Sequence, residues 1–205
     1  MKVCQHKKKG DATVFAQKGG IVWGKQAGAT DADLAEAKRL YALAKGCRLA
    51  DGSKPQSVLS LEAAENGDKV ISLMVGSQGN GAGPTPPATR ADSQNPSIGA
   101  PGTVYFNPWK VGAYGDGTFR IPEASLVHEI HHAWEYTQGI SSPTRQGREV
   151  SATSIENWHR KAMGVPQRTA YGAWPVSTHL RSLHEIYCIH DECGYCAFSE
   201  FTYKV

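Results

Sequence analysis

The chain has no long hydrophobic run, although 40% of its 205 residues are apolar. A membrane-spanning helix needs about 20 consecutive apolar residues, so we expect no membrane span. Residues 1–10 are polar and basic and no apolar region follows them, which argues against a conventional secretory signal peptide. We interpret residues 1–10 as a solvated basic tail.

A strong excess of either charge is also missing. The formal net charge is only +3, and the single basic run is Lys7–Lys9. Aromatic residues are not interleaved with basic residues in a way that would make a stacking platform for bases. A nucleic-acid partner is therefore not expected.

The five cysteines are too few and odd in number for a fully paired disulfide framework. Three of them lie near the C-terminus, where Cys188, His190, Cys193 and Cys196 could hold a structural zinc ion. Cys193 and Cys196 could instead form a redox pair. Because zinc sites normally use two well-separated ligand pairs, ordinary thiols or one disulfide are the favoured interpretation.

The length predicts a single domain over residues 1–205, and no internal repeat is visible. In the N-terminal part, β-prone runs at 13–15 and 21–23 flank a hairpin-like turn. A helix is expected to start at Thr30 as N-cap and to stop at Gly46 or at Asp51–Gly52. The runs 58–61 and 69–75 flank an Asn-Gly turn and predict a second hairpin, with a short helix over 62–65 as the alternative.

Residues 77–102 contain ten Gly or Pro among 26 positions, which predicts a flexible loop and not a regular element. A strand is expected directly afterwards, over 103–106. The remainder is predicted to be helical: from Pro122 to Gly139, from Thr144 or Arg148 to Met163, and from Ser177 to about Cys188. The predicted class is α+β, with a small N-terminal sheet plus helix and a helical C-terminal half.

The most informative segment is His128-Glu129-Ile130-His131-His132. Residues four apart in a helix share one face, so His128 and His132 can bind a single zinc ion. Glu129 lies near enough on the helix to take a proton from a zinc-bound water, whose pKa falls to about 7. His131 breaks this spacing and is interpreted as a neighbour, not a ligand.

Catalytic zinc normally has three protein ligands. The metzincin extension is excluded, because Glu135 and Gln138 stand where its Gly and His would be. A carboxylate of the following helix is the simplest third ligand, and Glu149 and Glu156 are the candidates. We favour Glu149, since the small Ala152 lets the two helices approach, and assign Glu156 to support a ligand histidine.

Negative charge that develops on an attacked carbonyl oxygen needs hydrogen-bond donors. Arg168 and Tyr171, three residues apart just after the second helix, offer a guanidinium and a phenol. By composition alone this is a weak signal, because Arg and Tyr in a loop are usually surface groups.

The candidate site residues occur along the chain in this order: the HExxH motif, Glu149 within Arg148–Ala152, Glu156-Asn157 and Arg168-x-x-Tyr171. Two other features, Asn107-Pro108 and Pro122, come before the HExxH motif. The segment from 103 to 172 resembles the zinc metallopeptidases that bacterial secretion systems deliver: NleD-like type III effectors and related toxin domains on type VI spike and Rhs proteins. It is distantly similar to the clostridial neurotoxin light chains. That family commonly has two acids at the third-ligand position, whereas Arg148 precedes Glu149 here.

The resemblance implies a zincin-like, specifically gluzincin, fold with residues 121–172 as the catalytic segment. It implies zinc held by His128, His132 and Glu149, with Glu129 as general base and Arg168 and Tyr171 stabilising the oxyanion. The implied function is a zinc endopeptidase that leaves the cell through a specialised secretion system and cuts a protein of the target cell. An immunity protein or a secretion-apparatus carrier would be its partner besides the substrate.

Three other interpretations remain open. The chain could be a non-catalytic, metal-stabilised protein that binds a partner through residues 77–102. It could be a zinc amidase that acts on peptidoglycan. It could also be a plain cytoplasmic peptidase, since the missing signal peptide fits that location equally well.

Overall fold

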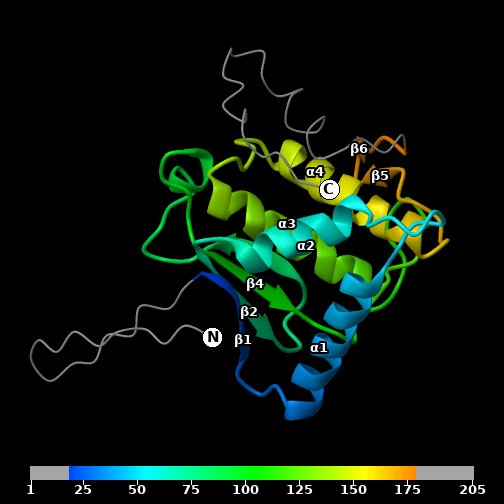
Figure 1. The fold of residues 1–205 in the computed structure, drawn as a ribbon, viewed down its shortest axis with the longest axis horizontal. Coiled ribbons are helices and arrows are strands. Elements are labelled where there is room, and N and C mark those ends of the chain that lie inside the picture. Colours follow the sequence, from blue (N-terminus) through cyan, green and yellow to red (C-terminus); the bar gives the residue numbers. More distant parts are fainter. Residues whose placement is uncertain (1–18, 179–205) are drawn as a thin grey trace, which may run out of the picture.

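A computed structural model describes residues 19–178. Its centre is a four-stranded sheet in the order β1-β2-β4-β3, with the helices gathered against it (Figure 1). The strands are β1 (Gly20–Lys25), β2 (Val70–Val75), β3 (Gly81–Pro84) and β4 (Gly102–Phe106). Strands β1, β2 and β4 run parallel, and β3 is an antiparallel edge strand beside β4. The predicted α+β class is confirmed.

Two helices connect β1 to β2: α1 (Asp31–Gly46) and α2 (Gln56–Asn66). The start of α1 is the predicted one, because the Thr30 side chain accepts from the Asp33 backbone N–H and the Asp33 carboxylate accepts from the Thr30 backbone N–H. This reciprocal capping satisfies two donors that the first turn leaves open. The buried stripe Ala37, Leu40, Tyr41 and Ala44 also repeats as predicted.

The predicted hairpin over 58–61 and 69–75 is wrong in its first half. Residues 56–66 form α2, and Val58, Leu61 and Ala64 are buried at helical spacing on one face. The Asn66-Gly67 pair ends this helix, with Gly67 as its C-cap, and does not turn a hairpin. The interpretation failed because a short apolar run fits a helix and a strand equally well, and the apolar surface at Leu61 and Ala64 is buried only if the run is helical. The second half is correct, since β2 occupies 70–75.

The predicted flexible loop over 77–102 contains more regular structure than expected. It includes β3 and a short 3₁₀ helix, η1 (Asp92–Gln94). Gly81 to Pro84 pair with residues 102–105 of β4, so the glycines form an edge strand despite their low strand propensity. Pro84, which has no N–H to donate, is tolerated because it stands at the end of an edge strand.

The C-terminal part of the described chain is helical as predicted. It consists of α3 (Pro122–Gln138) and α4 (Arg145–Ala162), followed by a small hairpin of β5 (Ala170–Tyr171) and β6 (Trp174–Pro175). Pro122 occupies the first turn of α3, and Gly139 ends it with a φ of 70°, a left-handed conformation that favours glycine. The predicted strand over 13–15 and the helix after Ser177 lie outside the described residues.

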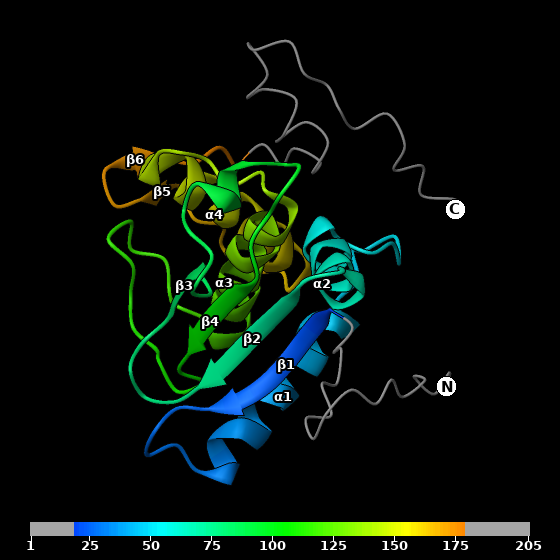
Figure 2. The same ribbon diagram turned by 90° about the vertical axis from the view of Figure 1, so that its left-hand side faces the viewer.

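The sheet is buried on the face against which α1, α2 and α3 pack (Figure 2). Burial alternates along β2, where Ile71, Leu73 and Val75 are fully buried and the residues between them are not. One hydrophobic cluster joins these strand residues to Leu126, Ile130 and Ala133 of α3. Helix α4 packs on α3 as a further layer. The HExxH motif therefore lies on a helix that is held between the sheet and α4.

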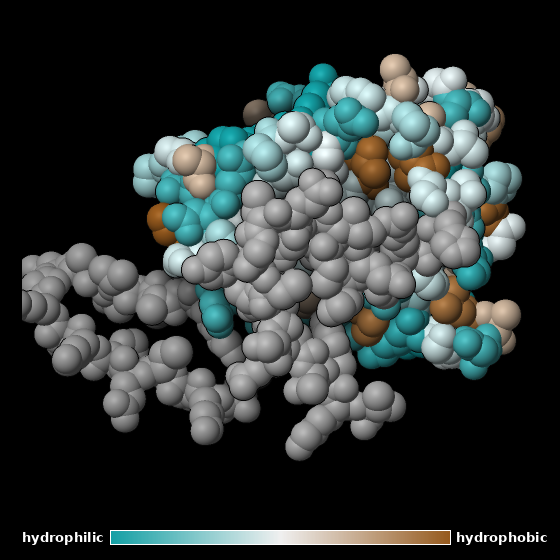
Figure 3. All heavy atoms as spheres, turned by 90° about the horizontal axis from the view of Figure 1, so that it is seen from above, coloured by the Kyte–Doolittle hydropathy of each residue, from teal (hydrophilic) through white to brown (hydrophobic). Residues whose placement is uncertain are grey.

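Among the described residues, every helix is too short or too polar to cross a bilayer. Seen from above, hydrophobic residues in the coloured part of the surface are scattered among hydrophilic ones (Figure 3). Such isolated apolar residues are normal on a protein surface.

The close approach of β4 to α3 depends on Gly102. A Cβ added there would lie 2.8 Å from the Ala133 Cβ and 3.2 Å from the Ala133 carbonyl oxygen. We expect Gly102→Ala to push the strand from the helix and to lower the free energy of unfolding by about 1–3 kcal/mol, as overpacking does. Gly83→Ala in the neighbouring strand is the matched control, because nothing lies within 4 Å of an added Cβ there. Urea unfolding measures both variants, and equal midpoints would contradict the claimed contact.

Candidate metal centre

Helix α3 presents His128 and His132 to one side while its opposite side is buried against the sheet. The two imidazole rings lie edge to face with their centroids 4.8 Å apart. Both histidines are almost completely buried. Their Nε2 atoms point toward α4, where Glu149 lies one turn after the Thr144 N-cap.

A single oxygen of Glu149 lies 3.3 Å from His128 Nε2 and 3.4 Å from His132 Nε2. These distances are long for hydrogen bonds, which cluster near 2.9–3.0 Å. They match the edge of a tetrahedron around zinc, about 3.3–3.5 Å for bonds of about 2.0–2.2 Å to nitrogen and oxygen. The three ligand atoms thus form a triangle that can share one ion.

The other nitrogen of each ring faces a second carboxylate. His128 Nδ1 lies 3.2 Å from Glu156, and His132 Nδ1 lies 3.8 Å from Glu135. Ser151 donates its hydroxyl to Glu135 at 2.6 Å, which holds that carboxylate in place. Carboxylates behind ligand histidines orient the rings and raise their basicity.

The charge of this cluster also suits a divalent cation. Its four carboxylates face two buried guanidiniums, so with neutral imidazoles the net charge is −2. The carboxylates are Glu129, Glu135, Glu149 and Glu156, and the guanidiniums are Arg160 and Arg168. A dication bound by the histidines would neutralise the cluster.

The close packing of these charges raises the pKa of His132 and lowers the pKa of Glu149. Burial alone would lower the pKa of His132, but Glu135 and Glu149 outweigh it and raise it well above the usual value. Burial would raise the pKa of Glu149, yet hydrogen bonds from His128 and His132 bring it far below its ordinary range. When no metal is bound, the raised pKa values favour protonated imidazoles, whose positive charge offsets part of the negative charge of the carboxylates.

Glu129 lies on the same helix beside a cavity of about 240 Å³ that His128, Arg168 and Tyr171 also line. Burial raises the pKa of Glu129, and the negative charges of Glu149 and Glu156 raise it further. The structure therefore places a carboxylate with elevated proton affinity at a cavity that it shares with the ligand residue His128.

The two predicted donors reach this cavity from the segment after α4. Tyr171, in β5, stacks on His128 with ring centroids 5.9 Å apart. Burial raises the Tyr171 pKa, as do Glu149 and Glu129, so the phenol keeps its proton. The Arg168 guanidinium lies over the Tyr114 ring, 3.6 Å from its centroid, and contacts Glu156 at 3.1 Å. Arg168 thus also has a structural role, because it holds the carboxylate behind His128.

His131 points away from the ligand triangle. It is fully buried, and its Nδ1 lies 2.8 Å from the Ser60 hydroxyl while its Nε2 lies 3.3 Å from the Ser151 hydroxyl. Burial lowers the pKa of His131, whereas the carboxylates beside His128 and His132 outweigh burial and raise theirs. It links α3 to α2 and α4 as a core residue.

Several residues of the site were not predicted from the sequence. Glu135 could have been found, because its spacing of three from His132 places it on the same helical face. Asn157 belongs to the Glu156-Asn157 part of the sequence pattern, but its role was not predicted: its side-chain amide donates to the Arg168 carbonyl and accepts from the Arg168 N–H at 2.9 and 2.7 Å. Tyr114 lies in a loop with no regular pattern, and only the fold brings it under Arg168. The Cys188–Cys196 cluster lies outside the described residues.

No model of a protein family matches the chain, and neither a curated protein nor a solved structure matches it. What the structure supplies is a set of buried groups that can hold a metal ion.

Glu135→Gln tests the arrangement around His132, because it removes a charge but changes the size of the side chain little. We expect zinc affinity to fall about 10–100-fold, the usual effect of changing a group behind a ligand histidine. Glu62→Gln, which breaks a surface ion pair with Lys54, is the control and should leave affinity unchanged. Competition with a chromogenic chelator measures both, and equal affinities would show that Glu135 does not support the site.

Proposed function

We propose that this protein is a zinc-dependent endopeptidase of the gluzincin type, delivered as an effector or toxin and acting on a protein of the target cell. The observation that carries the proposal is the convergence of His128, His132 and Glu149 on one point, with Glu129 beside it at the cavity. The order and spacing of these residues, which resemble the NleD-like peptidases, support the delivery route and the substrate class.

His128, His132 and Glu149 would hold the zinc ion. When bound, zinc supplies a Lewis acid that activates water and polarises the carbonyl of the scissile bond. Glu129 accepts the proton of the attacking water and then donates it to the leaving amine. Burial raises the pKa of Glu129, and a higher proton affinity helps a carboxylate to accept the proton of the attacking water.

Tyr171 and Arg168 donate hydrogen bonds to the carbonyl oxygen as it gains negative charge. Tyr171 remains protonated at neutral pH because its pKa is raised, so its O–H is available for this role. Asn157 and Glu156 hold Arg168 from two sides. Donors that are already held in place before the reaction need little reorganisation energy when the oxyanion forms.

The position of Glu129 also bears on the alternatives. A metal-stabilised binding protein needs the ligand triangle and the carboxylates behind it, but it has no use for a carboxylate with elevated pKa at the cavity wall. This favours an enzyme over a binding protein. A zinc amidase would use the same groups, so the substrate has to be decided by experiment.

Glu129→Gln is the most direct test of catalysis. We expect the variant to bind zinc as the parent does and to lose about 10²–10⁴-fold in cleavage rate, the range for a general base. Cleavage is followed by labelling new N-termini in extracts of bacterial and of eukaryotic cells, with and without a chelator. Glu62→Gln is the control for the removal of a surface charge. Unchanged cleavage by Glu129→Gln would contradict the proposed role.

Tyr171→Phe removes one hydroxyl and keeps the ring that stacks on His128. Loss of a single oxyanion donor costs about 10²–10³-fold in kcat, and we expect a loss in that range or somewhat smaller, with KM nearly constant. Trp174→Phe alters the neighbouring ring, which stacks on Tyr171 with centroids 6.1 Å apart, and should have a much smaller effect. If both variants lose the same activity, the phenol O–H has no special part in the reaction.

A further inference from the structure

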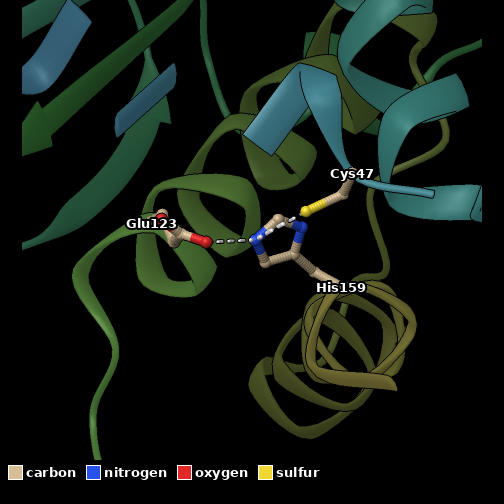
Figure 4. Close-up of side chains that lie close together, drawn as sticks. All are labelled: Cys47, Glu123 and His159. Carbon is tan, nitrogen blue, oxygen red and sulfur yellow. Dashed lines mark hydrogen bonds and ion pairs between the residues drawn. The ribbon is translucent and has the colours of Figure 1, made fainter. Parts of the chain in front are cut away.

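A second set of metal-ligating side chains lies where three helix ends meet. Cys47 caps the C-terminus of α1, Glu123 is in the first turn of α3, and His159 is in the last turn of α4 (Figure 4). His159 is fully buried, Glu123 nearly so, and Cys47 is partly exposed. One ligand atom from each lies within 4.8 Å of the other two.

Two of these groups approach the same atom of the third. The Cys47 Sγ lies 4.0 Å from His159 Nε2, and the Glu123 Oε1 lies 3.3 Å from that nitrogen. In a nucleophile–base–acid triad the thiol and the carboxylate would contact opposite nitrogens of the ring. Convergence of all three on one side of the ring is instead the arrangement that a shared cation requires.

The distances are close to those around zinc. In tetrahedral coordination, with bonds of about 2.3 Å to sulfur and 2.0 Å to nitrogen, these two ligand atoms lie about 3.5 Å apart. The 3.3 Å between Glu123 and His159 matches a tetrahedral edge, and the Cys47 Sγ, at 4.0 Å from His159 Nε2, has to move about 0.5 Å closer to share the ion. A thiolate, an imidazole and a carboxylate together favour zinc over the hard cations magnesium and calcium, which prefer oxygen ligands.

The local electrostatics favour a cation as well. A Cys47 thiolate and a Glu123 carboxylate carry two negative charges, which one dication balances. The C-terminal ends of α1 and α4 add the negative ends of two helix dipoles at Cys47 and His159, and the N-terminal end of α3 adds one positive end at Glu123. The partial exposure of Cys47 leaves one side open for water as a fourth ligand.

This cluster is separate from the candidate catalytic centre. Glu149 and His159 are ten residues apart on α4, which corresponds to about 15 Å along the helix axis. No ligand is shared between the two groups. An ion at Cys47 would tie α1 to the two helices that carry the catalytic residues.

We propose that Cys47, Glu123 and His159 bind a second zinc ion, independent of the ion at His128, His132 and Glu149. The full chain should then bind two zinc ions. Cobalt(II) in place of zinc should give a near-ultraviolet thiolate-to-cobalt charge-transfer band, because only this one of the two sites contains a cysteine.

Two variants separate this site from the other sulfur groups. Cys47→Ser should remove one ion per chain and abolish the charge-transfer band. The double variant Cys193→Ser/Cys196→Ser should keep both ions and the band. The proposal is overturned if Cys47→Ser keeps the band, or if only the C-terminal double variant loses it, which would assign the second ion to the C-terminal cysteines.

A third variant separates this inference from the proposed function. His128→Ala/His132→Ala should keep one zinc ion and the full cobalt–thiolate band, and added zinc should still raise its melting temperature. That rise should vanish when Cys47→Ser is added. Loss of the rise in the His128→Ala/His132→Ala variant itself, with the parent still stabilised by zinc, would contradict the second site and leave the catalytic centre untouched.

Discussion

The packing of α4 on α3 is the contact on which the rest of the site depends. It brings Glu149 to both imidazoles of the HExxH motif and, two turns later, brings Glu156 to the far side of His128. Both carboxylates are largely removed from solvent: His128 and His132 stabilise the charge of Glu149, and His128, Arg160 and Arg168 stabilise that of Glu156. If the helices separated, several buried charges would lose their partners together, so the metal-binding geometry and the stability of the helical layer rest on the same contact.

The sheet supplies the rigid support for this helix pair. Gly102 lets β4 approach Ala133, and the buried residues of β2 and β4 pack against the other side of α3. The helix that carries His128 and His132 is therefore fixed on one side by apolar packing and on the other by charged contacts. Arg168 extends the charged layer, because it joins Glu156 to the cavity wall, and the β5–β6 hairpin then positions Tyr171 over His128. Structure and proposed chemistry thus use the same residues.

The helical half was predicted better than the sheet, for a physical reason. Caps, glycine stops and the 3.6-residue period are local signals, so the bounds of α1, α3 and α4 could be read from nearby residues. The run 58–61 lacked such a signal, and its helical state follows from the burial of Leu61 and Ala64 in the core. Likewise, residues 81–84 form a strand because β4 offers an open edge, which their own Gly and Pro content would not predict.

The sequence by itself determined that His128, Glu129 and His132 share a helix, because helical periodicity is a property of neighbouring residues. A carboxylate of the next helix beside them was a prediction that followed from the three protein ligands of catalytic zinc. Only the tertiary structure decided between Glu149 and Glu156 for the place between the imidazoles, since that choice depends on how two helices cross. The tertiary structure also decided which carboxylates face the Nδ1 atoms of His128 and His132. It alone brought Cys47, Glu123 and His159 together. Contacts between residues far apart in the chain are set by packing, and no local pattern encodes them.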